Sequence, residues 1–337
     1  MSKSAIRDYV IALVAKFPKA PALTLAKKAY REHPEYWASL ERCRCHIRYY
    51  LGVSGVANRE SARNTHSHFI RPARKAGWHD VIPEELVQLP DWKAFVIDGA
   101  HKALIISDIH VPFHDSAALE VALEIGRKRK VSLIILDGDI ADHYAISDYM
   151  RDPALRDFAG EIKAIRQLLA GLRRRFGKQC RIIYKHGNHE ERFERYMRMK
   201  APELLGVPEF SWESIFGLEE YGIELVGHKR PIRLGKLNVI HGHEYVFQIS
   251  NPVNPARGFF MRAKTHVIGG HFHQTSNHSE KNLEQTVIST WSLGALCNLH
   301  PEYRPLNNWN HGFAFVETDK TGTFHVENLR VINGKVY

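Results

Sequence analysis

The residues Leu133-Ile-Ile-Leu-Asp-Gly-Asp-Ile-Ala-Asp142 decide the fold of this chain. The stretch begins with four apolar residues and ends its apolar run at Asp137-Gly-Asp139. Such a run is typical of a buried parallel strand that carries carboxylates at its C-terminal end. Open α/β sheets bind their ligands at that edge. Alone, the motif is weak evidence, because turns favour Asp and Gly for local reasons.

The same pattern recurs at four other places along the chain. Apolar runs lead into Asp108-Ile-His110 upstream and into Gly187-Asn-His-Glu190 downstream. Two later runs lead into His241-Gly-His243 and Gly270-His-Phe-His273. Asp, Asn and His are residue types that bind metal ions. Five strand ends that offer them predict a metal site assembled from across one domain.

Strand and helix patterns alternate in the middle of the chain, which predicts a parallel sheet. This alternating part comprises strands at 103–108, 131–137 and 181–185 and helices at 116–129 and about 154–175. After about residue 222 the pattern changes to short strands, at 223–226, 231–234, 237–240, 266–269, 286–290, 313–317 and 323–328. We therefore expect a layered α/β sandwich with mixed sheets.

Length, hydropathy and cysteine content narrow the class of protein. The 337 residues are enough for one large and one small domain. No apolar run approaches the roughly 18 residues that span a bilayer, and the N-terminus lacks the apolar core of a signal peptide. The four cysteines lack Cys-x-x-Cys spacing and the density of a disulfide framework. We expect reduced thiols, a cytoplasmic protein and no membrane partner.

The positive charge is concentrated at the start of the chain. Residues 1–80 contain 15 Lys and Arg against 6 Asp and Glu, whereas 81–337 contain 32 against 31. Almost all of the net charge of +10 therefore lies in the first quarter. A basic module joined to a near-neutral domain indicates a polyanionic partner, although excess charge also serves solubility.

Residues 1–52 predict a small all-α domain. Apolar residues at helical spacing predict a first helix that ends before Pro18, and Thr24 and Ser39 are the expected N-caps of two more helices. Three short helices with a basic third one resemble the architecture of a helix-turn-helix DNA reader. The residues expected to contact nucleic acid are Arg42, Arg44 and Arg48. The alternative is a bundle for packing or self-association, with these arginines in water.

A linker is expected between this domain and the rest of the chain. Residues 53–76 are polar with few apolar anchors, and the stretch from Trp78 to Trp92 is rich in loop signals. We place the linker at 53–95 and the large domain at 96–337.

The five motifs, in this order, resemble those of the calcineurin-like metallophosphoesterases. They are Asp108-x-His110, Gly138-Asp139-x-x-Asp142, Gly187-Asn188-His189-Glu190, His241-Gly242 and Gly270-His271-x-His273. The resemblance covers roughly residues 100–330 and implies a four-layer α/β/β/α sandwich of mixed sheets with a dinuclear metal site. Serine/threonine phosphatases continue the second motif with Arg-Gly, whereas this chain continues with His143-Tyr144.

The resemblance implies which residues hold the two metal ions. Asp139 is the shared ligand, which offsets the repulsion between cations about 3.5–4 Å apart. The remaining ligands are Asp108, His110 and His273 for one ion and Asn188, His241 and His271 for the other. Mixed imidazole and oxygen ligands suit divalent transition-metal ions better than Ca²⁺. We expect Mn²⁺, with Fe, Zn or Ni as alternatives.

Three polar residues next to the ligands receive roles by the same resemblance. His189 is the expected catalytic residue, which stabilises the phosphoryl charge or protonates the leaving oxygen. The alternative for His189 is a purely structural role. Asp142 either orients His189 or another ligand from behind, or is a surface carboxylate. Glu190 is expected only to favour a helix N-terminus electrostatically.

The stretch between His241 and His271 offers further cations. A loop bracketed by two ligand-bearing strands must run near the metal ions, so its basic residues are expected to contact the substrate phosphate. These residues are Arg257, Arg262 and Lys264. The alternative is a helix whose aromatic side chains pack while its charges face water.

These observations predict a metal-dependent phosphodiesterase or nuclease. The expected reaction is attack by a metal-bound hydroxide on nucleic acid, with DNA favoured and the N-terminal module bringing the substrate. One alternative is a phosphomonoesterase acting on proteins or nucleotides. Another alternative is a DNA-binding scaffold with an inactive core. The presence of a ligand residue at every motif argues against this alternative.

Overall fold

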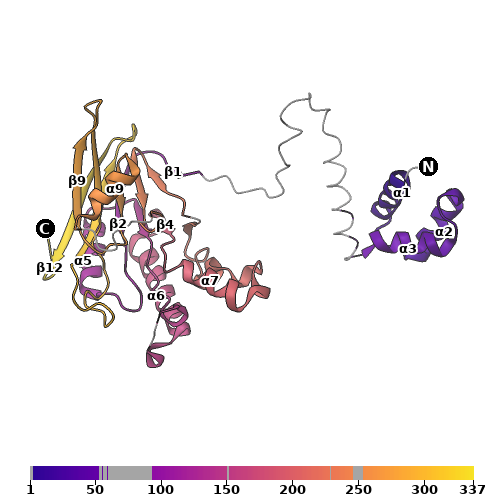
Figure 1. The fold of residues 1–337 in the computed structure, drawn as a ribbon, viewed down its shortest axis with the longest axis horizontal. Helices are drawn as coiled ribbons and strands as arrows, with labels where there is room; N and C mark the ends of the chain where they lie inside the picture. The colour runs from indigo at the N-terminus through magenta and orange to yellow at the C-terminus, as the bar shows by residue number, and fades with distance from the viewer. Residues whose placement is uncertain are drawn as a thin grey trace. The chain divides into compact units, whose positions relative to one another are not determined.

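The computed structural model describes residues 3–52, 55, 59, 93–149, 152–227, 229–245 and 253–337 (Figure 1). The chain divides into two compact units, Met1–Leu89 and Pro90–Tyr337, each of which is described by itself. The predicted linker at 53–95 lies almost entirely outside the described residues. A search of the described ranges found no helix with the length and hydropathy of a membrane span.

The N-terminal unit is all-α in its described part. It contains α1 (Lys3–Lys16), α2 (Ala22–Glu32), the 3₁₀ turn η1 (Pro34–Tyr36) and α3 (Leu40–Tyr50). The three α-helices share one apolar core, made by Val10, Leu13, Val14, Leu25, Ala26, Ala29, Trp37, Cys43, Ile47 and Tyr50. The predicted cap of α3 is confirmed, because Ser39 Oγ accepts a hydrogen bond from the backbone N–H of Arg42 at 3.2 Å. The cap at Thr24 was wrong, because Pro21, with φ −59°, already suits a helix start.

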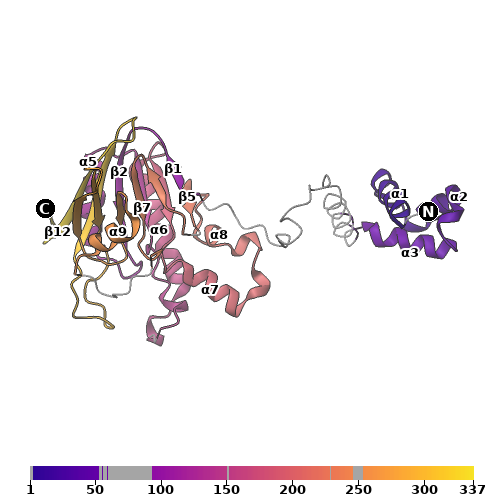
Figure 2. The same cartoon turned by 45° about the horizontal axis from the view of Figure 1, so that its top comes forward.

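Two mixed sheets form the centre of the second unit (Figure 2). The larger sheet contains, in spatial order, β13 (Lys335–Val336), β12 (Phe324–Ile332), β11 (His311–Thr318), β2 (His101–Ile106), β3 (Leu133–Asp137), β4 (Arg181–Lys185) and β5 (Ile223–Val226). The smaller sheet contains β1 (Phe95–Ile97), β6 (Ile232–Leu234), β7 (Leu237–Ile240), β8 (Val267–Gly269), β10 (Val287–Ser292) and β9 (Ser276–Lys281). Strands β2 to β5 run parallel, as do β7 and β8.

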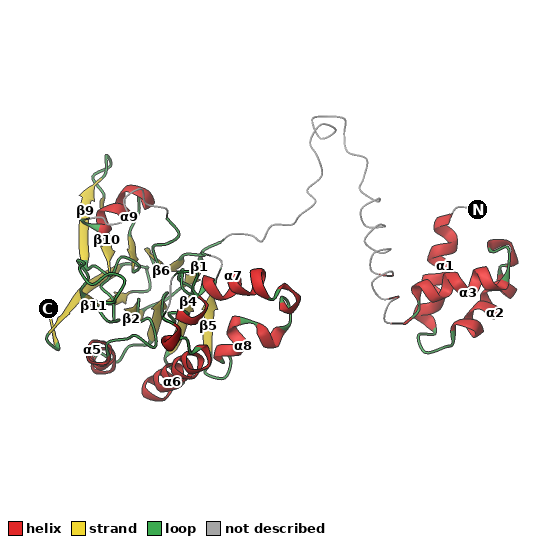
Figure 3. Ribbon diagram, turned by 60° about the horizontal axis from the view of Figure 1, so that its bottom comes forward, coloured by secondary structure: helices red, strands yellow, loops and turns green. Residues whose placement is uncertain are grey.

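Helices cover the outer face of each sheet. The helices of this unit are α5 (Ser116–Lys128), α6 (Phe158–Phe176), α7 (Glu191–Lys200), α8 (Trp212–Phe216) and α9 (Pro255–Ala263). Short 3₁₀ turns are η3 (Tyr144–Ile146), η4 (Pro153–Leu155), η5 (Pro202–Leu204) and η6 (Pro208–Phe210). Figure 3 shows α5 and α6 on one side of the strands and α9 on the other. The prediction of an α/β/β/α sandwich is therefore confirmed.

Strand β2 shows why the central strands are apolar throughout. Leu104 and Ile106 belong to the apolar cluster under α5 and α6, whereas Ala103 and Ile105 belong to the cluster between the sheets. Successive side chains of a strand point to opposite faces, so a strand buried on both faces reads as a continuous apolar run. These runs located the strands, and the predicted strands at 181–185, 223–226 and 237–240 match β4, β5 and β7.

Strand β9 was not predicted. It has the sequence Ser-Asn-His-Ser-Glu-Lys and is largely exposed, since it lies at the edge of the smaller sheet. Edge strands carry polar residues that discourage pairing with other chains, so β9 lacks the apolar alternation that reveals a strand. Only its ladder with β10, from Ser276↔Ser292 to Lys281↔Val287, identifies it.

Candidate metal centre and active site

Six of the seven predicted metal ligands meet at one edge of the two sheets. Asp108 and Asp139 follow β2 and β3, whereas the histidines follow β2, β7 and β8. His273 Nε2 lies 3.1 Å from Asp108 Oδ1 and 3.2 Å from His110 Nε2. His241 Nε2 lies 3.3 Å from Asp139 Oδ2. Parallel strands of both sheets end at this edge, so each sheet contributes part of the site.

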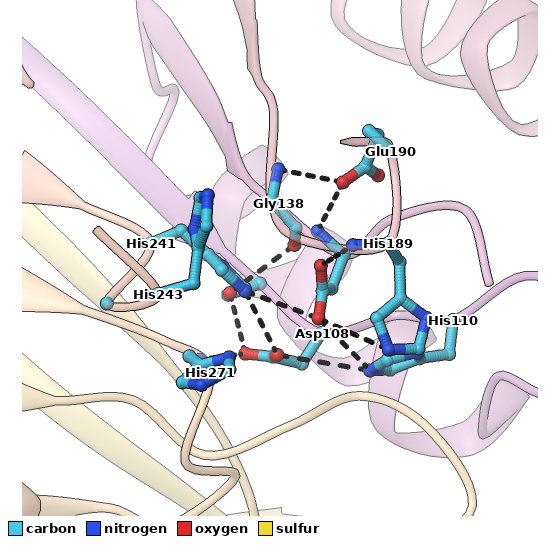
Figure 4. A network of polar contacts seen from close by, with 12 residues as sticks. Asp108, His110, Gly138, His189, Glu190, His241, His243 and His271 are labelled. Carbon is cyan, nitrogen blue, oxygen red and sulfur yellow. Dashed lines mark hydrogen bonds and ion pairs between the residues drawn. The ribbon is translucent and has the colours of Figure 1, made fainter. Parts of the chain in front are cut away.

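Among the described residues, the candidate ligand atoms fall into four groups, and two of these groups share Asp139. Within each group the atoms lie within 4.8 Å of one another. Of the two groups with Asp139, one contains Asp108, His110 and Asp139, and the other contains Asp139, His241 and His271. Figure 4 shows His110, His241 and His271 around the carboxylate of Asp108. The seventh predicted ligand, Asn188, directly precedes His189, whose Nε2 is 3.7 Å from Asp139 Oδ2.

Several ligand atoms at this site have no hydrogen-bond partner among the described residues. These buried atoms are Asp108 Oδ1, Asn188 Oδ1 and His241 Nε2. A buried polar atom without a hydrogen bond costs about 1–3 kcal/mol. Two of these atoms face other predicted ligand atoms, since Asp108 Oδ1 is close to His273 Nε2 and His241 Nε2 is close to Asp139 Oδ2. A carboxylate oxygen, an amide oxygen and an imidazole nitrogen are donors that divalent transition-metal ions accept. The residues present therefore fit a metal ion.

In three of the predicted ligands, the second oxygen or nitrogen of the side chain is held by a hydrogen bond from or to the protein. Asp108 Oδ2 accepts hydrogen bonds from Ser107 Oγ at 2.7 Å and from the backbone N–H of His271 at 2.9 Å. Asp139 Oδ1 accepts one from the backbone N–H of His189 at 2.9 Å. His241 Nδ1 lies 2.6 Å from the backbone oxygen of Asp137, to which it donates. These contacts orient the free ligand atoms toward the centre of the site.

The charges of the site keep its carboxylates ionised. Burial alone would raise the pKa of Asp139, but the charge and hydrogen bond of His241 beside it hold that pKa well below its ordinary value. Burial likewise opposes protonation of His110, yet its hydrogen bond to Asp142 raises the pKa of His110 to about 9. Ionised carboxylates are the form that binds cations.

The backbone of the predicted ligands lies mostly in the left-handed region. Positive φ angles occur at Asp108 (53°), His110 (50°), Asp139 (52°), His271 (71°) and His273 (56°). Residues other than glycine rarely adopt this conformation. Each instance costs of order 1–3 kcal/mol and persists only where the surrounding structure imposes it. Such strain concentrates at functional sites.

At two motif positions only glycine fits, because side-chain atoms of the site lie very close to the backbone there. A Cβ atom on Gly187 would lie 2.3 Å from Asp139 Oδ1, and one on Gly270 would lie 2.0 Å from Ser107 Oγ. Both contacts are far shorter than van der Waals distance. Any side chain at these positions would therefore displace a carboxylate of the site or the hydroxyl that holds one.

Glu190 has a larger role than the sequence predicted. It is fully buried and accepts hydrogen bonds from five described donors. The donors are the backbone N–H groups of Asp139 (3.0 Å), Ile140 (2.9 Å), Ala141 (3.1 Å) and Gly187 (2.8 Å) and the Tyr184 hydroxyl (2.7 Å). Glu190 thus fixes the loops after β3 and β4, which carry the ligands. The earlier expectation of a merely electrostatic effect at a helix end was wrong.

Asp142 orients two residues of the site. Its Oδ2 is 3.0 Å from His110 Nδ1, which leaves His110 Nε2 to face the ligand group. Its backbone oxygen is 2.8 Å from His189 Nδ1. A carbonyl oxygen can only accept, so His189 carries its proton on Nδ1 and its Nε2 is an acceptor. The structure therefore places Asp142 behind both rings and not on the surface.

Arg192, in the first turn of α7, is a site residue that sequence reasoning missed. Its guanidinium donates to His189 Nε2 at 2.8 Å and to the backbone oxygen of Asp142 at 3.0 Å. The one available signal was its position two residues after the Gly-Asn-His-Glu motif. A fixed cation at this point can bind a phosphate oxygen beside His189.

The predicted phosphate contacts lie on α9 and at its C-terminal end. The side chains of Arg257, Arg262 and Lys264 are exposed, and the Nζ atom of Lys264 lies 5.5 Å from the ring centroid of Phe260. Phe259 is buried and packs α9 on the smaller sheet. The arrangement corresponds to the helical alternative, and the contact of these three residues with substrate stays a prediction.

The arginines predicted to bind nucleic acid lie on α3 of the N-terminal unit. Arg42 and Arg48 are exposed, and Arg44 pairs with Glu41 at 3.3 Å. Tyr49 is exposed beside them. Their contact with nucleic acid stays a prediction.

Residues 101–286 match the family model of the calcineurin-like phosphoesterases. No curated protein matches the chain. Similar solved structures include a Vps29 single mutant from Entamoeba histolytica, at 13% identity and a TM-score of 0.37, which covers 70% of this chain and 96% of that one. Another is YfcE, a phosphoesterase from E. coli, at 15% identity and a TM-score of 0.33, which covers 64% and 91%.

The family match decides the class of protein. The matched range spans more than half of the chain and contains all five motifs together with the two groups of ligand atoms that share Asp139. This protein belongs to the calcineurin-like phosphoesterase family, and it is a metal-dependent hydrolase that acts on phosphate ester bonds.

Proposed function

We propose that this protein is a phosphodiesterase that cleaves nucleic acid, with DNA as the favoured substrate. The observation that carries the proposal is the pair of ligand groups that share the Asp139 carboxylate. Asp108, His110 and His273 would hold one cation, and Asn188, His241 and His271 the other. When bound, two divalent cations screen the charge of a phosphate ester and supply a hydroxide at neutral pH. Mn²⁺ is the ion that we expect.

His189 and Arg192 are the residues that act on the phosphoryl group. His189 lies beside Asp139 and its Nε2 accepts from Arg192. When substrate binds, a phosphate oxygen would take the place of His189 Nε2 as the hydrogen-bond acceptor of the Arg192 guanidinium. His189 Nε2 would then be free to face the ester. Arg192 then offsets the negative charge. His189 must first bind a proton at Nε2, and in that form it stabilises the negative charge or passes the proton to the leaving oxygen.

The N-terminal unit supports a nucleic-acid substrate. Its excess of positive charge and the exposed Arg42 and Arg48 on α3 suit a polyanion. Binding through phosphates weakens with salt, so the affinity of the full-length protein for DNA should fall between 50 and 200 mM salt. An affinity that stays constant over this range contradicts phosphate contact.

A hydrolysis assay with added Mn²⁺ tests the proposal. Its substrates are a bis-aryl phosphate, an aryl monophosphate, and single- and double-stranded DNA. Turnover of the diester and DNA supports the proposal, whereas turnover of the monophosphate alone makes the protein a monoesterase. The variant Asp139→Asn removes the shared charge and should abolish metal-dependent turnover. Equal activity of the variant and the wild type would refute the site.

A further inference from the structure

A cationic groove leads away from the metal centre along α7. It is a cavity of about 630 Å³ whose wall includes the predicted ligand Asn188. Its four cationic side chains are Arg192, Arg195, Arg198 and Lys229. Arg192 also contacts His189, so the groove begins at the reacting phosphate. We refer to this cavity as the α7 groove.

The three arginines of the groove form a row. They are three residues apart on one helix, so they share a face, and from Arg192 to Arg198 they span about 9 Å along the axis. Helix α7 extends outward from the sheets (Figures 1 and 2). The row therefore begins at the metal centre and ends in solvent, as a path for a chain of phosphates would.

The outer cations are available to an anion. The exposed fractions of the side chains of Arg195, Arg198 and Lys229 are 55%, 68% and 49%. Their acidic partners are Asp148, Glu194 and Glu191, the last two of which also line the groove. Exposed ion pairs contribute at most about 1 kcal/mol. Exchanging such a partner for a phosphate oxygen therefore costs little.

Tyr149 adds an aromatic surface to the same wall. Its side chain is exposed, and the guanidinium of Arg192 lies 5.9 Å from its ring centroid. A groove that combines cations for the backbone with an aromatic ring for a base is typical of proteins that bind single strands. The cavity has the size of a small-molecule pocket, whereas a duplex needs a broad surface.

We propose that the α7 groove binds the phosphates next to the scissile phosphate of a single nucleic-acid strand, and that Tyr149 stacks on a base of that strand. This inference rests on the proposed function, because the inference specifies the substrate of the same active site. Arg195, Arg198 and Lys229 contact the flanking phosphates, and Arg192 contacts the one that reacts. A substrate with one phosphate reaches only Arg192.

The test compares two double variants in the full-length protein. Arg195→Ala/Arg198→Ala removes two charges from the groove, and Arg174→Ala/Lys178→Ala removes two exposed charges near the end of α6. For each, kcat/KM is measured with a single-stranded oligonucleotide and with a bis-aryl phosphate in Mn²⁺. Binding of a labelled oligonucleotide is measured by anisotropy in EDTA at several salt concentrations.

The groove variant should lose about ten-fold in oligonucleotide kcat/KM, chiefly through KM, and much less with the small diester. The slope of log affinity against log salt should become shallower by about 1.4, because each lost contact to a single strand contributes about 0.7. Lys229→Asn, which suits the left-handed backbone at φ 56°, should act in the same direction. It provides a second variant if the first folds poorly.

The two levels of inference fail differently. A wild type that hydrolyses neither the diester nor DNA refutes the proposed function. Suppose instead that the wild type cleaves both substrates. If the Arg195→Ala/Arg198→Ala variant then has the same kcat/KM and the same salt slope as the Arg174→Ala/Lys178→Ala variant, the inference about the groove is overturned.

Discussion

The buried carboxylate of Glu190 gives the sharpest prediction about how the site is held. In the variant Glu190→Gln, one carboxylate oxygen becomes an NH₂ group. Glu190 Oε2 accepts from the N–H groups of Asp139 and Gly187, and Oε1 accepts from three further donors. Whichever way the amide turns, at least two buried donors then face another donor.

The size of the effect follows from these contacts. Each buried donor that loses its acceptor costs about 1–3 kcal/mol, and the remaining bonds weaken because the acceptor is no longer charged. We expect the free energy of unfolding of the α/β unit to fall by about 4 kcal/mol. Metal affinity should fall as well, because the Asp139 loop loses its anchor.

Urea denaturation of the full-length protein measures this loss, followed by circular dichroism and tryptophan fluorescence. The matched control is Glu194→Gln in α7, which begins directly after Glu190, because the Glu194 side chain is half-exposed and pairs with Arg198. The control should stay within about 0.5 kcal/mol of the wild type. Equal midpoints for the two variants would refute the claim that Glu190 fixes the ligand loops.

Three further predictions concern thiols, acid and metal ions. At pH 8 a disulfide reagent should react quickly with the exposed Cys45 and slowly with the three buried thiols. Burial raises the pKa of Cys43 and of Cys180 to about 11 and that of Cys297 to about 12. Four fast thiols before denaturation would contradict this burial. The second prediction concerns acid. Burial would raise the pKa of Glu244, but the charge of Lys185 outweighs it and lowers this pKa to about 2. The native carboxyl therefore binds fewer protons than the unfolded one, so about 3 kcal/mol of stability present above pH 4.5 should disappear as the pH falls toward 2. Acid titration of unfolding should show a weaker dependence in Glu244→Gln, and an unchanged one would exclude this pair as its source. Finally, Mn²⁺ at 100 times its Kd should stabilise the wild type by about 2.7 kcal/mol in thermal unfolding. Asp139→Asn should lose most of this gain, and an equal shift in both proteins would mean that the ion binds elsewhere.

The sequence predicted well what depends on local pattern. Strands buried on both faces, such as β3 and β4, are continuous apolar runs, and their ends carry the ligand residues within a few positions. The order of the motifs was therefore enough to identify the family and the fold. The identity of Asp139 as the residue common to both groups also came from its motif.

Residues whose role depends on tertiary contacts could not be predicted in this way. Glu190 ends the Gly-Asn-His-Glu motif and Arg192 follows two residues later, but the local sequence does not show which charged side chains of this stretch are buried. Only the fold shows which of these side chains point inward. The stretch with Arg257 is bracketed by ligand-bearing strands, and the sequence left open whether it forms a loop or a helix. The structure shows the helix α9, whose Phe259 packs on the smaller sheet.

The spread of the ligands along the chain has a consequence for biosynthesis. They extend from Asp108 to His273, and they come from strands of both sheets. A chain leaving the ribosome therefore cannot form either complete set of ligands early, since the first set needs His273 and the second needs His271. The N-terminal helices, whose contacts are local, can fold long before that point. Binding of the metal ions is therefore expected late in folding, after the two sheets have packed against each other.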